Sequence, residues 1–261
     1  MQGKIRFIPF RKYEPALNMA LDQVLLESDE FIAGGGLVLR LYGWSTPTLS
    51  LGKSQKEITD IDLNLARERG LSLVRRSTGG QTVLHDQELT YSVVGGMPPF
   101  SRGVIESYKM IALPLQQALL SLGTKVELAG VHSDDKPKKF KPTSSHCFLE
   151  PSAHEVMVGG KKLIGSAQKR SKGKLLQHGS LPLAINRQLW AELWQVENVS
   201  QDDGSRYTSL SEALNREVKI EELYEPLKKA FSEAFKMELV DADFSAEELA
   251  LAAQLVKSYQ V

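Results

Sequence analysis

The chain of 261 residues is poor in the features that would place it outside a reducing compartment or in a membrane. It has a single cysteine, so no internal disulfide can form. No uncharged apolar run reaches the roughly 18 residues that a membrane helix needs, and the segment 1–6 lacks the apolar core of a signal peptide. Lysine plus arginine and aspartate plus glutamate both number 32, so no overall field favours nucleic acid or a membrane surface. We therefore expect a cytoplasmic protein that binds neither, with its cysteine free for chemistry.

The pattern of apolar residues predicts an α/β (α+β) fold, because helical and strand periods are interspersed along the chain. We expect a core domain over 1–185 and a helical C-terminal extension over 186–261 that packs on it. Helices are predicted at 16–28, 60–69 (with Asp60 as the cap), 107–122, 187–196, 208–214, 220–235 and 246–259; strands are predicted at 37–42, 48–51, 71–74, 87–94, 125–128, 155–158, 162–166 and 175–181.

A glycine-rich loop with two arginines follows the apolar run 71–74. Arg75 and Arg76 are fixed positive charges, and Thr78 is followed by Gly79 and Gly80, where the backbone can turn and expose its N–H groups. Such a loop suits a polar or anionic part of a substrate. The alternative from the residues alone is an ordinary turn with surface arginines.

Five segments, in order along the chain, together resemble the lipoate–protein ligase A family, which also contains cofactor-independent octanoyltransferases. The resemblance implies a mixed sheet flanked by helices, as in biotin and lipoate protein ligases. It also implies that the loop residues above, together with His85, Gly165, Ser166, Ala167 and His178, bind substrate. The segments are 18–22, 42–52, 75–94, 160–168 and 176–181.

Cys147 is the candidate nucleophile. A lone cysteine is usually buried and inert, but Cys147-Phe148 followed by Gly160-Lys161-Lys162 resembles the cysteine-dependent octanoyltransferase branch of the family. The resemblance implies that Cys147 takes the acyl group and that Lys162 lowers the pKa of its thiol. Because neighbouring strand residues point to opposite faces, only one of the two lysines can serve; the alternative is that both are solvated.

The resemblance implies an acyltransferase that moves an octanoyl group from acyl carrier protein, through a cysteine thioester, to a lysine of the glycine cleavage H protein or another lipoyl domain. No cofactor and no metal are expected. The basic run 136–141 is either a dock for the acidic carrier or a solvated loop, and His146 and His154 are expected to have surface or structural roles.

Three alternatives remain. One is an ATP-dependent lipoate–protein ligase. Gln81 counts against this alternative, because such ligases usually have a third glycine at that position. Another is an amidotransferase that takes octanoyl from H protein. The third, a non-enzyme, is a module that only binds lipoyl domains.

Overall fold

The structure is a computed structural model that describes residues 3–32, 34–56, 58, 61–130, 155–195 and 206–261. Cys147, the basic run 136–141, His146 and His154 lie outside the described residues.

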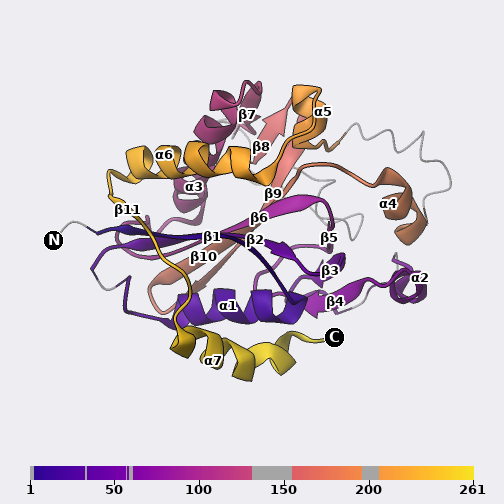
Figure 1. Ribbon diagram of the computed structural model, residues 1–261, viewed down its shortest axis with the longest axis horizontal. Helices are drawn as coiled ribbons and strands as arrows, with labels where there is room; N and C mark the ends of the chain where they lie inside the picture. The colour runs from indigo at the N-terminus through magenta and orange to yellow at the C-terminus, as the bar shows by residue number, and fades with distance from the viewer. Residues whose placement is uncertain (1–2, 33, 57, 59–60, 131–154, 196–205) are drawn as a thin grey trace.

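An eight-stranded mixed sheet forms the centre of the molecule (Figure 1). The first three strands in spatial order are parallel and the later pairs are antiparallel. In that order the strands are β11 (Leu239–Asp241), β1 (Ile5–Tyr13), β2 (Leu37–Trp44), β6 (Glu88–Gly96), β10 (Lys174–Pro182), β9 (Lys161–Ser171), β8 (Val156–Val158) and β7 (Val126–Leu128).

A second, three-stranded sheet carries the glycine-rich loop. Its middle strand β3 (Thr48–Leu51) pairs in parallel with β4 (Ser72–Arg75) and antiparallel with β5 (Val83–His85). The loop predicted from the sequence therefore connects β4 to β5. The chain then passes directly from β5 into β6 of the main sheet, so this loop lies where the two sheets meet.

Two helices cover each face of the main sheet (Figure 1). On one face α3 (Val104–Ser121) packs against α6 (Tyr224–Phe235), and on the other α1 (Pro15–Glu27) packs against α7 (Ala246–Leu255). The remaining helices are short: α2 (Leu63–Glu68), α4 (Arg187–Leu193), α5 (Leu210–Leu214), and the 3₁₀ turns η1 (Ile220–Leu223) and η2 (Val256–Tyr259).

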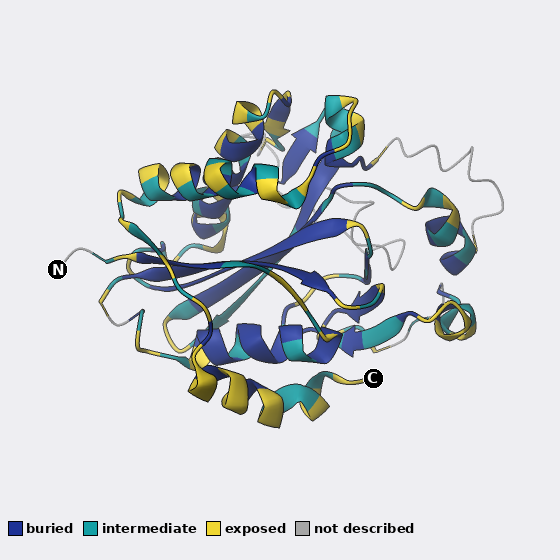
Figure 2. Ribbon diagram, viewed as in Figure 1, coloured by how far each residue is buried: buried dark blue, intermediate teal, exposed yellow. Residues whose placement is uncertain are grey.

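Burial follows these layers, since the central strands are dark along their whole length in Figure 2. Every residue of β2 and β6 is buried. Leu39 and Leu115 belong to the core on the α3 side, and Leu21 and Val38 belong to the core on the α1 side. A strand with a helix layer on both faces loses its polar alternation, which explains why β2 is apolar on both faces apart from Arg40.

The predicted mixed α/β fold is confirmed, with differences in detail. The predictions omitted β1, whose sequence mixes Pro9 with charged residues, and the three-residue strand β5. They also made the segment after 186 entirely helical, whereas β11 adds a strand beside β1. Asp62, and not the predicted Asp60, caps α2, accepting from the backbone of Asn64 and Leu65.

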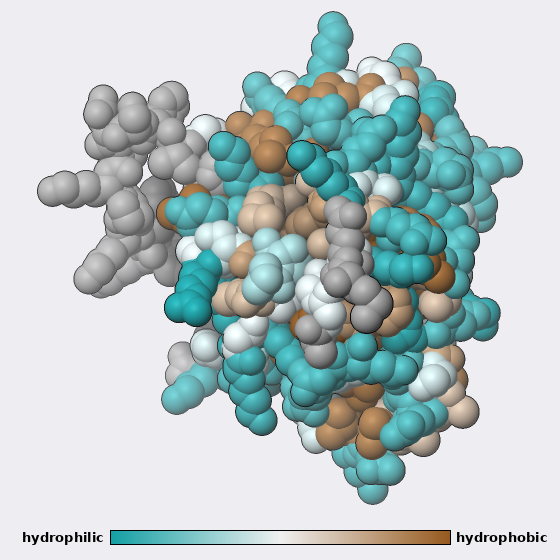
Figure 3. Space-filling view, turned by 90° about the vertical axis from the view of Figure 1, so that its left-hand side faces the viewer, coloured by the Kyte–Doolittle hydropathy of each residue, from teal (hydrophilic) through white to brown (hydrophobic). Residues whose placement is uncertain are grey.

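Elements on both sides of residue 185 contribute to the one main sheet. The division of the chain at that residue stays a prediction. Among the described residues, no helix combines the length and the apolar character needed to cross a bilayer. On the face shown in Figure 3, hydrophobic side chains form small separate groups within a largely hydrophilic surface.

Candidate active site

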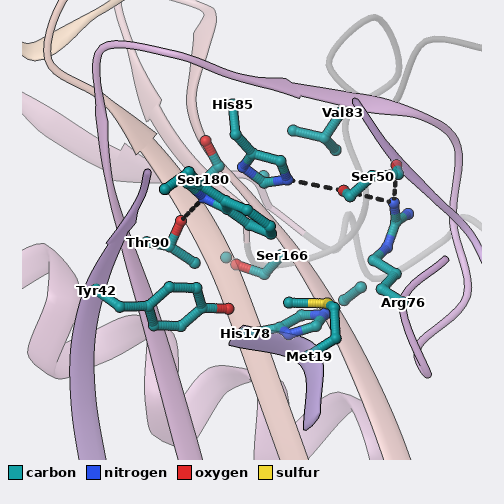
Figure 4. Close-up of a pocket in the computed structure, with 14 residues that line it drawn as sticks. Met19, Tyr42, Ser50, Arg76, Val83, His85, Thr90, Ser166, His178 and Ser180 are labelled. Carbon is teal, nitrogen blue, oxygen red and sulfur yellow. Dashed lines mark hydrogen bonds between the residues drawn. The ribbon is translucent and has the colours of Figure 1, made fainter. Parts of the chain in front are cut away.

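A cavity of about 370 Å³, part of it open to solvent, lies where the two sheets meet (Figure 4). Helix α1 and strands of both sheets contribute its walls. The lining residues are Met19, Tyr42, Trp44, Ser50, Arg76, Val83, His85, Thr90, Gly165, Ser166, Ala167, His178, Gly179 and Ser180.

His178 belongs to a buried network under α1. Its Nδ1 lies 3.0 Å from Asp22 Oδ2, and its Nε2 lies 2.7 Å from Thr78 Oγ1. Asp22 also accepts from Arg40 Nη1 at 2.7 Å and from the hydroxyl of Tyr42 at 3.1 Å. The carboxylate of Asp22 is thus shared by a guanidinium, a phenol and an imidazole.

Burial and the neighbouring charges shift the pKa values of Asp22 and His178 in this network. Burial alone would raise the pKa of Asp22, but Arg40 and His178 hold it below its ordinary value. Burial lowers the pKa of His178 despite the carboxylate beside it, and the charge of Arg76 acts in the same direction. At neutral pH the network therefore contains a carboxylate and a neutral imidazole.

His85 forms a second histidine–carboxylate pair on the opposite wall. Its Nδ1 lies 2.9 Å from Glu88 Oε1 and its Nε2 lies 2.7 Å from Ser50 Oγ. The indole of Trp44 stacks on the imidazole, with ring centroids 4.2 Å apart. Glu88 also accepts hydrogen bonds from Trp44 Nε1, Thr90 Oγ1 and Ser180 Oγ. Burial acts to raise the pKa of Glu88, but His85 and the hydroxyl donors lower it below its usual range.

Arg76 holds the glycine-rich loop in shape. Its guanidinium donates to the backbone carbonyls of Ser50, Gly79 and Gln81, at 2.6 to 3.2 Å, and to Ser50 Oγ at 3.2 Å. Gly80 has a φ of +92°. A Cβ added to Gly52 would come within 1.8 Å of the Gly80 carbonyl, so the loop packs directly on the end of β3.

The polar groups of the cavity are turned toward one another. Every polar side chain that lines it hydrogen-bonds to another protein group, as described above and, for Ser166, to Tyr91 at 2.7 Å. What remains facing the interior is largely carbon, from Met19, Val83, the aromatic rings and the glycine backbone (Figure 4). Such a wall suits an aliphatic chain better than a charged group.

Lys162 lies on β9, the strand that also lines the cavity with Gly165, Ser166 and Ala167. Its side chain is 1% exposed, and its Nζ forms an ion pair with Glu155 Oε1 at 2.7 Å. Lys161, its neighbour, is partly exposed, as strand alternation requires. Burial and the nearby charge of Glu155 raise the pKa of Tyr91 to about 12, and the hydroxyl of Tyr91 contacts Ser166.

The predicted site residues divide into two groups. Arg76, His85, Gly165, Ser166, Ala167 and His178 line the cavity. Arg75, Thr78, Gly79 and Gly80 do not; the Arg75 guanidinium donates to the carbonyls of Gly52 and Gln55, and Thr78 supports His178. Their role in substrate binding stays a prediction.

The sequence analysis missed the carboxylates that orient both histidines, and also Ser50. Asp22 carries a readable signal, because it lies four residues after Asn18 on an otherwise apolar helix face, and Arg40 hydrogen-bonds to both. Glu88 is a charged residue inside a strand whose every residue is buried. Ser50 has no such signal. Within the described ranges, no group of three His, Cys, Asp or Glu side chains could hold a metal ion.

The lipoyl protein ligase A/B catalytic domain matches residues 14–232. A protein of Brevibacillus brevis named octanoyltransferase LipM is 39% identical, covering 97% of this chain and 95% of that one. Its namesake from Staphylococcus aureus is 33% identical, covering 97% and 95%.

Solved structures share the fold at lower identity. A lipoate–protein ligase A bound with ATP has a TM-score of 0.78 at 21% identity, covering 98% of this chain and 95% of that one. A bipartite lipoate protein ligase of Thermoplasma acidophilum has 0.77 at 20%, covering 98% and 92%. The match over most of the sequence and the full-length relatives lead to one conclusion: this chain belongs to the lipoyl protein ligase A/B catalytic-domain family.

Proposed function

We propose that the protein is an octanoyltransferase of protein lipoylation that works through an acyl-cysteine intermediate. The observation that carries this proposal is its likeness to octanoyltransferases over nearly the whole length of both chains. Cys147 is the nucleophile, Lys162 its partner, and the cavity holds the octanoyl chain.

The reaction has two halves. In the first, the thiolate of Cys147 attacks the thioester carbonyl of the donor, and the thiol of the donor leaves. In the second, the amine of a lysine on the acceptor attacks the new thioester, and Cys147 leaves as the product amide forms. Exchange between thioesters followed by amide formation is downhill, so no nucleotide is consumed.

Lys162 serves both halves in this proposal. An ammonium close to a thiol lowers the pKa of that thiol, since opposite charge favours the thiolate. The same cation stabilises the oxyanion of each tetrahedral intermediate. Burial strengthens both effects, and Glu155 fixes the position of the ammonium at 2.7 Å.

The cavity supports an acyl substrate through its walls. Its polar groups are already paired, and Met19 and Val83 add hydrocarbon at its interior. An octanoyl chain there is removed from water without leaving any protein donor or acceptor unpaired. The cavity also adjoins β9, so a carbonyl at the head of the chain lies toward the strand that carries Lys162.

The donor in this proposal is octanoyl-acyl carrier protein, and the acceptors are lipoyl-domain proteins, with the glycine cleavage H protein preferred. The reaction takes place in the cytoplasm. Arg76 weighs against an ATP-dependent ligase, because its N–H groups are directed at Ser50, Gly79 and Gln81 and hold the loop closed. A phosphate would have to displace these bonds.

The test is a comparison of donors with apo H protein as the acceptor. We expect modification with octanoyl-carrier protein and none with octanoate, ATP and magnesium. AMP release coupled to modification would replace the transferase with a ligase. Octanoyl-H protein, offered as the donor to a second lipoyl domain, measures the amidotransferase alternative; if it is the faster donor, the carrier protein is not the natural one.

A further inference from the structure

Two hydrogen-bonded chains of hydroxyl, imidazole and carboxylate reach the cavity wall through their histidines. One is Ser50–His85–Glu88 and the other is Thr78–His178–Asp22, and each hydroxyl lies 2.7 Å from an imidazole Nε2. Both carboxylates have a pKa below the ordinary value, so each is ionised and can only accept from Nδ1. In the neutral imidazole, Nε2 is therefore the acceptor, and each hydroxyl donates to it.

The two chains differ in what neutralises the carboxylate. Asp22 forms a buried ion pair with Arg40, so its charge is already balanced. Glu88 forms no ion pair with a lysine or arginine of the described residues, and its one titratable partner is His85. The negative charge of Glu88 is therefore not balanced by a fixed cation among the described residues.

The chains also differ in what reaches the cavity. Ser50 lines it, whereas Thr78 does not. The Ser50 hydroxyl donates to His85 Nε2 and accepts from Arg76 Nη1 at 3.2 Å, which leaves one lone pair for a group inside the cavity. Figure 4 shows Ser50 between His85 and Arg76 at the edge of the cavity.

Amide formation needs a base at this stage. A lysine side chain has an ordinary pKa of about 10.4, so the acceptor arrives as an ammonium that cannot attack a thioester. The guanidinium beside Ser50 lowers the pKa of an ammonium that approaches it, since like charges disfavour the protonated form.

We propose that Ser50 and His85 form the proton relay that deprotonates the acceptor lysine, with Glu88 positioning the imidazole; this rests on the acyl-cysteine transfer proposed above. Ser50 Oγ takes a proton from the ammonium as its own proton passes to His85 Nε2. The neutral amine forms the C–N bond, the C–S bond to Cys147 breaks, and the second proton of the nitrogen goes to the departing thiolate. The imidazolium then releases its proton to water.

The relay is tested on isolated octanoyl-enzyme, whose deacylation is followed with two nucleophiles. One is an apo lipoyl domain, whose lysine must lose a proton; the other is hydroxylamine, which is neutral at pH 7 and needs no base. We expect His85→Gln and Ser50→Ala to slow transfer to the lipoyl domain by about 10²-fold or more, and to change the hydroxylamine reaction by less than about threefold. Glu88→Gln should fall between these variants and the wild type.

Thr78→Val and His178→Gln are the matched controls, because they remove a hydroxyl and an imidazole from the Thr78–His178–Asp22 set. Any loss they cause should be equal for the two nucleophiles. If His85→Gln slows both nucleophiles equally, or slows neither, the relay is wrong even though octanoyl-enzyme forms. If the wild-type protein forms no octanoyl-enzyme at all, the proposed function itself fails, and the relay fails with it.

Discussion

Two buried ion pairs of equal length start from strands of the central sheet, one from β2 and the other from β9. Arg40 and Asp22 are 2.7 Å apart, as are Lys162 and Glu155, and each of the four side chains is at most 3% exposed. They differ in their surroundings. Arg40 is enclosed by aromatic rings, with its guanidinium carbon 3.9 Å from the centroid of the Tyr42 ring. Glu155, in contrast, directly follows the segment that contains Cys147.

The two ion pairs also differ in the chemistry of the cation, which is a guanidinium in Arg40 and an ammonium in Lys162. A guanidinium is always charged and forms several directed bonds, as Arg40 does with Asn18 and Asp22. A lysine ammonium is a compact charge that can turn toward a reacting group. We therefore interpret the first pair as a structural element that holds α1 and His178 in place, and the second as part of the chemistry. The predictions below test this division.

The largest effect is expected from breaking the structural pair. Asp22→Ala leaves Arg40 and His178 without their buried carboxylate, and we expect the free energy of unfolding to fall by about 3–5 kcal/mol. Urea denaturation measures this loss. Asp243→Ala, which removes the partly exposed pair with Arg11 at 2.5 Å, is the control and should cost less than about 1 kcal/mol. Equal losses would mean that burial does not distinguish the two carboxylates.

The chemical pair is tested by a substitution that conserves its charge. Lys162→Arg keeps a cation for Glu155 but replaces the compact ammonium, so we expect acylation to slow by about tenfold to a hundredfold. Alkylation of Cys147 by iodoacetamide across a pH series should show a raised thiol pKa. Lys161→Arg on the opposite face of β9 should match the wild type. If both variants behave alike, Lys162 has no special role.

Acid should act on the structural network first. The pKa of His178 is lowered in the folded protein by burial, so its stabilising contribution is complete above the unfolded value of about 6.5 and is lost as the pH falls through the folded value. The pKa values of Asp22 and Glu88 are also lowered, so their contributions are lost only below about pH 4.

We therefore expect the free energy of unfolding to fall from pH 7.5 to pH 5.5 by at most about 1.4 kcal/mol, the limit for one proton over one pH unit, and to fall again below pH 4. Urea denaturation at the three pH values measures both steps. His178→Gln should remove much of the first step and leave the second. A wild-type protein as stable at pH 5.5 as at pH 7.5 would contradict the assignment.

The smallest effect is expected at the cavity wall between the two pairs. Met19→Phe places a rigid ring where the thioether lies, so we expect KM for an octanoyl donor to rise by several-fold while a butyryl donor is affected less. Kinetics with both donors measure the ratio. An unchanged ratio would show that the acyl chain binds elsewhere.

Local elements and family motifs could be predicted from the sequence, whereas the long-range pairings of side chains could not. Strands such as β3 and β6 follow from alternation or from continuous apolar runs, and motif resemblance pointed to Lys162, His85 and His178. No pattern in the sequence indicates which carboxylate meets which histidine. Asp22 meets His178 across 156 positions, through the packing of α1 on the sheet. The strand β11 has three residues, too few for a periodic signal, and depends on β1 for its pairing.

The central claim is that Cys147 carries the acyl group, and the intact mass of the protein after incubation with octanoyl-carrier protein tests it most directly. We predict that the wild type gains one octanoyl group, that hydroxylamine removes it, and that peptide mapping places it on Cys147. Cys147→Ala should gain nothing while unfolding at the same urea concentration as the wild type. Full transfer to apo H protein by Cys147→Ala, or a wild type that transfers octanoyl without ever gaining its mass, would contradict the account.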